Sequence, residues 1–187
     1  MNPNQVVDDA SKKMATAVEH FRDELKKLRT GRAHASMLDG VMVEAYGAQM
    51  PLIQIATIST PEAQLLQISP FDPNNIQAIA AAIRNNQSLG LNPTDDGRVI
   101  RVPIPALTEE RRREIVKQAS QKQEDCMIVL RNVRREALDA VNNAKKDKEI
   151  SEDDVKRIEK QIDDALNKAR TDAEAAVKAK EQEIMTV

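Results

Sequence analysis

The side chains best suited to catalysis are few in this sequence and lie far apart. The chain has 187 residues, with two histidines, His20 and His34, and a single cysteine, Cys126. Nucleophilic catalysis needs a base within hydrogen-bond reach of the nucleophile, and a zinc site needs several ligands at short spacing. Neither pattern occurs, and no glycine-rich phosphate loop is present. We therefore expect no catalytic residue, no metal site, no cofactor and no enzymatic activity.

The remaining reactive groups have simple structural interpretations. The adjacent carboxylates Asp8-Asp9, Asp95-Asp96 and Asp163-Asp164 fall on expected helix surfaces or in a turn, where charge favours solubility. Cys126 falls among apolar residues at helical spacing, so we interpret it as a small core residue. One cysteine excludes an internal disulfide, and neither an export signal nor a run of about 18 apolar residues is seen. We expect a cytoplasmic protein without a membrane partner.

Positive charge gathers in one segment although the net charge of the chain is -2. Residues 106–148 hold eleven Lys and Arg against eight Asp and Glu. At about 100° per residue, five of these cations share an arc of about 100° that faces away from the apolar positions. They are Arg113, Lys117, Arg131, Arg134 and Arg135. Arginine forks bind phosphate oxygens, so this face is a candidate RNA-backbone contact, and an ordinary solvated face, interrupted by Glu124, is the alternative.

Three long amphipathic helices are predicted around these residues. The first covers residues 3 to 29 and ends at Arg29-Thr30-Gly31, where glycine can adopt the left-handed conformation. Its apolar positions are Val7, Ala10, Met14, Ala17, Phe21, Leu25 and Leu28. The second runs from an N-cap at Thr108 to about Lys145, and the third starts at Ser151, in a capping-box variant, and runs almost to the C-terminus. Each helix has one apolar stripe, which favours a three-helix bundle.

Residues 31 to 105 have a different pattern, typical of a small sheet domain. Alternating apolar residues predict strands at 41–46, 53–58, 65–68 and 99–104, and Asp72-Pro73 predicts the start of one helix. The predicted fold is α+β, a long three-helix bundle formed by residues 1–30 and 106–187 with a β/α/β domain, residues 31–105, inserted between its first and second helices. The connections at Thr30-Gly31 and Ile104-Pro105 form a candidate double hinge, unless the domains pack rigidly and these residues only punctuate helices.

Seven segments, in the same order along the chain, resemble motifs of the bacterial-type ribosome recycling factor family. They are Leu28-Arg29-Thr30-Gly31-Arg32-Ala33, Leu38-Asp39-Gly40, Tyr46-Gly47, Leu89-Gly90-Leu91-Asn92-Pro93, Leu107-Thr108-Glu109-Glu110-Arg111-Arg112, Arg131-Asn132-Val133-Arg134-Arg135 and Ile150-Ser151-Glu152-Asp153. The resemblance covers essentially the whole chain. It implies an L-shaped monomer that acts on the post-termination ribosome with elongation factor G and GTP, dissociating the subunits and releasing mRNA.

The resemblance also implies roles for particular residues. Arg29, Arg131, Arg134 and Arg135 would contact RNA of the large ribosomal subunit, and the inserted domain would swing about the two connections. With three aromatic residues, one of them on an apolar stripe, a base-stacking platform is not expected, so binding would use shape and phosphate contacts. The rival interpretation is a coiled-coil scaffold or cochaperone, which predicts self-association and partner binding that is insensitive to salt.

Overall fold

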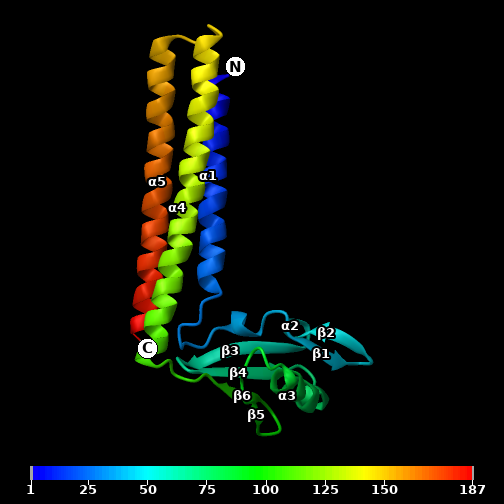
Figure 1. Ribbon diagram of the computed structural model, residues 1–187. Coiled ribbons are helices and arrows are strands. Elements are labelled where there is room, and N and C mark those ends of the chain that lie inside the picture. The colour runs from blue at the N-terminus through cyan, green and yellow to red at the C-terminus, as the bar shows by residue number, and fades with distance from the viewer. Residues whose placement is uncertain (1, 187) are drawn as a thin grey trace. The chain divides into compact units, whose positions relative to one another are not determined.

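The computed structural model describes residues 2–186, which form two compact units (Figure 1). Unit 1 consists of residues 2–29 and 109–186, and unit 2 consists of residues 30–108. Long helices make up unit 1, and the strands all belong to unit 2. The predicted α+β class, with a small sheet-containing region between the first and second long helices, is confirmed.

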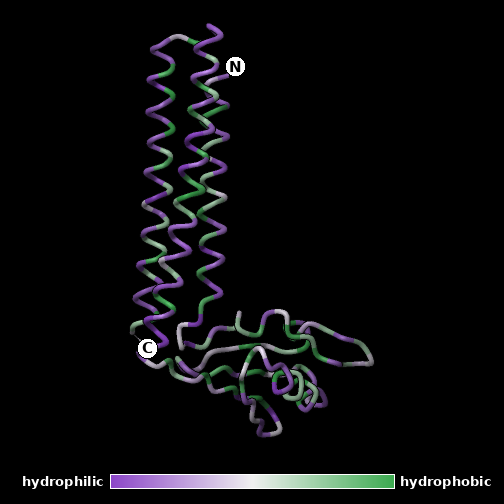
Figure 2. Tube along the Cα trace, in the orientation of Figure 1, coloured by the Kyte–Doolittle hydropathy of each residue, from purple (hydrophilic) through white to green (hydrophobic). Residues whose placement is uncertain are grey.

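Unit 1 is a bundle of α1 (Pro3–Lys26), α4 (Glu109–Lys146) and α5 (Glu152–Met185). Each helix contacts the other two, and Figure 2 shows apolar positions recurring along all three. The shared core includes Met14 and Phe21 of α1, Leu130 of α4, and Ile158 and Ile162 of α5. Amphipathic helices of this length gain most of their stability by burying such a stripe.

Local capping fixes the start of α5 and the C-terminal end of α4. The Ser151 side chain accepts a hydrogen bond from the Asp154 backbone N–H at 3.1 Å, and the Ser151 N–H donates to the Asp154 carboxylate at 3.2 Å. This confirms the predicted capping box. At the end of α4, Lys148 adopts a left-handed conformation (φ 58°), and the Glu149 N–H donates to the Ala144 carbonyl at 2.9 Å. These contacts satisfy carbonyls that would otherwise lack partners.

The predicted end of the first helix is wrong by three residues. α1 ends at Lys26, and Gly31 adopts its left-handed conformation (φ 79°) farther along the chain. Leu28 stays partly buried against the bundle core after the helix has ended. The apolar spacing therefore extends past the last helical residue, and the prediction followed that spacing.

Unit 2 contains two antiparallel sheets. A four-stranded sheet has the order β3-β4-β6-β5, formed by β3 (Ala56–Glu62), β4 (Leu65–Pro70), β6 (Ile100–Pro103) and β5 (Thr94–Asp95). The hairpin β1 (Met42–Ala45) and β2 (Ala48–Pro51) forms a two-stranded sheet. Helix α3 (Ile76–Asn85) buries Ile79 and Ile83 in the unit's core, which also includes Ile68 and Ile100. Two 3-10 turns, Ala35–Leu38 and Pro73–Asn75, complete the unit.

Unit 2 differs from the prediction around residues 48–55. The segment expected to be a strand from residue 53 begins with a helical turn, α2 (Leu52–Ile55), because Leu52 and Ile55 are both buried at a spacing of three residues while Ile53 is 65% exposed. Strand β2 was not expected, since Ala-Gln-Met-Pro lacks the β-branched residues typical of strands. Its hairpin turn places Tyr46 and Gly47 at positive φ (53° and 75°), as two-residue turns of this hand require.

Candidate nucleic-acid interface

Helix α4 is held by both neighbouring helices, and this determines which of its faces stays exposed. On one side, Lys122 Nζ bonds Glu24 Oε2 of α1 at 3.0 Å. On the other side, Arg134 Nε bonds Asp163 Oδ1 of α5 at 2.6 Å. The face away from the core therefore faces solvent in this unit. We call Arg113, Lys117, Arg131, Arg134 and Arg135 the α4 stripe.

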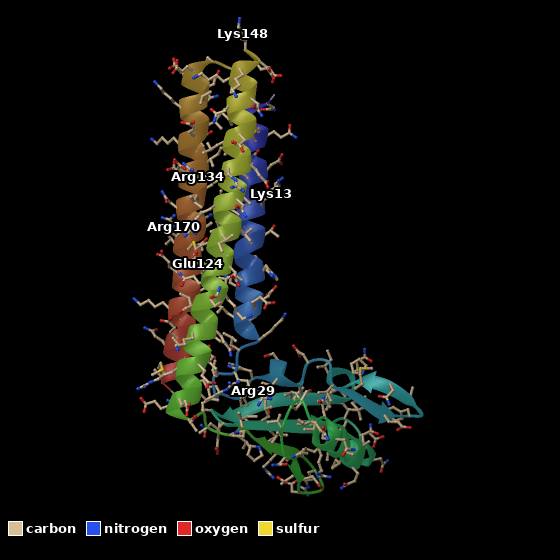
Figure 3. All side chains as sticks on the ribbon, viewed as in Figure 1. Lys13, Arg29, Glu124, Arg134, Lys148 and Arg170 are labelled. Carbon is tan, nitrogen blue, oxygen red and sulfur yellow. The ribbon has the colours of Figure 1, made fainter. Side chains whose placement is uncertain are left out.

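The structure brings these five cations together along one helix. Arg134 is half-buried and the other four are exposed. From the first to the last of them, the helix advances about 33 Å, so the stripe can reach several phosphates of one RNA backbone. Figure 3 labels Arg134 and the interrupting Glu124 on this part of the bundle.

Three arginines of the stripe bond to partners in α4 itself. Arg113 Nη2 lies 2.5 Å from Glu109 Oε1, and Arg131 Nη1 lies 3.1 Å from Glu124 Oε1. Arg135 Nη2 donates to the amide oxygen of Asn132 at 3.2 Å. Exposed ion pairs of this kind contribute little free energy, so phosphate oxygens can replace the carboxylates at small cost.

The charge of the stripe is only partly compensated. Within residues 2–186, neither Lys117 nor Arg135 forms an ion pair with a carboxylate. Arg134 is paired, and its hydrogen bond to Asp163 raises the pKa of the guanidinium above its ordinary value. The stripe therefore has an excess of positive charge available to an anionic partner.

Arg29 lies outside the α4 stripe. It is exposed and follows α1, in the segment that has left the helix. Figure 1 shows that α4 starts at the end of the bundle where α1 finishes, so Arg29 belongs to the same end of unit 1 as Arg113. Figure 3 labels it at that position.

A histidine and a cysteine, residue types that could serve catalysis, lie in one groove between α1 and α4. His20 and Cys126 both line this groove, which has a volume of about 250 Å³. His20, His34 and Cys126 lie far apart in the sequence, and no sequence pattern indicated that His20 and Cys126 share a groove. The Cys126 thiol donates to the Ala17 carbonyl at 3.7 Å, and burial raises its pKa. A nucleophilic thiol needs the opposite shift, so this geometry supports the interpretation of Cys126 as a core residue.

Within residues 2–186, no three His, Cys, Asp or Glu side chains are placed so that they could hold a metal ion. In the same part of the chain, no helix is both long enough and apolar enough to cross a membrane.

The groove lined by His20 and Cys126 also contains Glu24 and Lys122, which belong to a charge network that connects α1 to α4. Glu24 accepts from Lys27 at 2.8 Å and from Lys122 at 3.0 Å. The hydrogen bond from Lys27, followed by that from Lys122, lowers the pKa of Glu24 from its ordinary value of 4.5 to about 2. The charged form is therefore favoured in the folded protein.

Glu24→Gln is expected to change the acid sensitivity of unit 1. Because folding lowers the pKa of Glu24, its contribution to stability is complete above pH 4.5 and is lost as the pH falls towards 2. The variant should be less stable than the wild type at neutral pH and should lose less stability over that range. Urea unfolding at a series of pH values measures both, with Glu19→Gln on the same helix as the control. Parallel losses in the wild type and Glu24→Gln would contradict this expectation.

Comparisons with known proteins give consistent matches along the chain. The profile of the family described as "Ribosome recycling factor" matches residues 21–185. The ribosome-recycling factor of Mycobacteroides abscessus is 47% identical over 98% of this chain and 99% of its own length. That of Cutibacterium acnes is 44% identical over 98% of this chain and its whole length.

Solved structures match both units. The solution structure of a ribosome recycling factor, 39% identical, covers 100% of this chain and 99% of its own with a TM-score of 0.79. A second matching structure comprises models for the T. thermophilus ribosome recycling factor and the E. coli elongation factor G bound to the E. coli post-termination complex. Its matching chain is 38% identical, with a TM-score of 0.66 over 99% of this chain and 100% of its own.

Proposed function

Because the chain belongs to the ribosome recycling factor family, we propose that it binds the ribosome after termination and, with elongation factor G and GTP, separates it into subunits and releases mRNA. The observation that supports this most strongly is the similarity of both units, over essentially the whole chain, to a ribosome recycling factor described, like elongation factor G, by models bound to the post-termination complex. GTP hydrolysis belongs to that partner, and this chain takes no catalytic part. Action on ribosomes supports a cytoplasmic location.

The proposed contact with the ribosome is the α4 stripe together with Arg29, bound to RNA of the large subunit. The stripe offers arginine forks on a straight exposed face, and Lys117 adds a charge that no carboxylate within residues 2–186 neutralises. Tyr46 and Phe71, the two exposed aromatic residues, belong to unit 2, so no aromatic side chain interrupts the stripe. These features support binding to the RNA backbone through phosphates rather than through stacked bases.

Sedimentation with isolated ribosomal subunits tests this contact. The protein should pellet with large subunits and much less with small subunits, and the affinity should fall steeply as salt rises, because each phosphate contact releases counterions. Binding to large subunits that does not change between low and moderate salt would contradict an RNA-backbone interface.

We also propose that the two connections between the units act as hinges during splitting. Residues 27–34 and 104–108 lack helix and strand. Ile104 is buried in the core of unit 2, and its N–H donates to the Gln64 carbonyl at 2.8 Å, so it moves with that unit. The flexible part of the second connection is therefore Pro105 to Thr108. On the first connection, Thr30 and Gly31 are buried, and the positive φ of Gly31 favours glycine there.

Ala106→Pro should slow subunit splitting several-fold and leave large-subunit affinity unchanged. Proline fixes φ at its own position and restricts Pro105 before it, so the second connection becomes stiffer. Ala106→Gly, which loosens the same position, is the matched control and should not slow splitting. Stopped-flow light scattering gives the splitting rate, and sedimentation gives the affinity. Equal loss of both in Ala106→Pro would contradict the hinge proposal.

A further inference from the structure

Arg134 differs from the other arginines of the α4 stripe in where its partner lies. Arg113, Arg131 and Arg135 bond to side chains of α4 itself. Arg134 bonds across the bundle, from its Nε to Asp163 Oδ1 of α5 at 2.6 Å, and this is the shortest ion pair of the stripe after that of Arg113. Its position is therefore set by two helices, whereas each of the other three depends on one.

The contact uses one edge of the guanidinium and leaves the rest of it available. A guanidinium has five N–H donors, and Asp163 accepts only the one on Nε. Within residues 2–186, Arg134 forms no other side-chain hydrogen bond, so its four Nη hydrogens have no protein acceptor there. Two of them can bind a phosphate in the bidentate geometry that makes arginine–phosphate contacts strong. The side chain is also 40% exposed, so solvent reaches it.

From this geometry we infer that Asp163 is a positioning residue for RNA binding: it holds Arg134 by Nε and orders the guanidinium before a phosphate arrives. This inference rests on the proposed function. A free arginine side chain loses considerable rotational entropy when it binds, and a side chain that is already held loses less. The negative charge of Asp163 opposes phosphate binding only weakly, because the carboxylate is 46% exposed and water and salt screen it.

The variants Asp163→Ala and Asp163→Asn separate positioning from charge. Alanine removes both the acceptor and the charge, whereas asparagine removes the charge and keeps an oxygen that can accept from Nε. Asp164→Ala is the matched control, because this carboxylate is the neighbouring exposed residue and forms no ion pair within residues 2–186. The readouts are the affinity for isolated large ribosomal subunits at two salt concentrations and the thermal midpoint of each variant.

Asp163→Ala should bind large subunits roughly threefold to tenfold more weakly, the factor expected when one long side chain must be ordered on binding. Asp163→Asn should restore most of the affinity, and Asp164→Ala should bind like the wild type. In an Arg134→Ala background, Asp163→Ala should cause little further loss, which a purely structural role of Asp163 would not produce.

Three results would overturn the inference. Affinity of Asp163→Ala equal to or higher than that of the wild type would make Asp163 neutral or a competitor of phosphate. An equal loss with and without Arg134 would make its role purely structural. Unchanged affinity of Arg134→Ala alone would remove Arg134 from the interface, and with it the inference. Weaker binding by Arg134→Ala with unchanged binding by Asp163→Ala would leave the proposed function intact and reject only the role of Asp163.

Discussion

Replacing both Arg131 and Arg135 by glutamate is expected to lower the affinity for the large ribosomal subunit by roughly 100-fold at low salt. Each arginine is exposed and, in the proposed interface, donates charge-assisted hydrogen bonds to phosphate. Losing two such contacts costs on the order of 3 kcal/mol, which corresponds to roughly 100-fold in affinity. The slope of log affinity against log salt should also become shallower by about 1.4 to 1.8, because two fewer counterions are released.

The matched control changes net charge by the same amount on other parts of the bundle. Lys12 of α1 and Lys168 of α5 are both exposed, and neither forms an ion pair within residues 2–186. Lys168 lines a groove between α1 and α5 rather than the face of α4. Lys12→Glu with Lys168→Glu should therefore retain most of the affinity. Equal losses in the two double variants would show that only net charge matters and would contradict a localised interface.

The largest effect on stability is expected from Leu130→Ala. Leu130 is fully buried in the bundle core, between helices that contact one another along their length. Truncating a buried leucine to alanine loses apolar burial and leaves a cavity, at a cost of about 2–5 kcal/mol. α1, α4 and α5 contain most of the helical residues within residues 2–186, so far-UV circular dichroism during urea unfolding measures the stability of unit 1.

Ile128→Ala is the control for this core substitution. Ile128 belongs to the same helix, two residues before Leu130, but is 46% exposed. Its truncation removes fewer buried contacts and should change the free energy of unfolding by less than about 1 kcal/mol. If both variants lost the same stability, the burial that distinguishes the two positions would not be what stabilises the bundle.

The helices could be predicted well where the determinants are local. Ser151 and Asp154 form their capping box within four residues, and the start of α5 followed directly. The core of α1 was harder, because this helix packs against two neighbours and buries residues on both sides of its expected stripe. Val18, lining the groove towards α5, is fully buried although it was not on that stripe, whereas Ala17, lining the groove towards α4, is only half-buried.

Only the part of the candidate site that lies on a single helix, α4, could be predicted from the sequence. The angles between Arg113, Lys117 and Arg131 follow from the pitch of α4, so their shared exposed face was visible in the sequence. The pairing of Arg134 with Asp163 depends on how α4 and α5 rotate against each other, which no short-range pattern specifies. In unit 2, the turn at Leu52–Ile55 depends on tertiary burial that strand propensity does not capture.

We expect this chain to split post-termination ribosomes together with elongation factor G and GTP. Light scattering of cognate post-termination ribosomes, mixed with this protein, elongation factor G and GTP, tests it directly when each component is omitted in turn. We expect a fall in scattering that requires every component. No fall, although the protein binds the large subunit, would contradict the splitting function. No fall and no binding would instead favour a scaffold that binds protein partners.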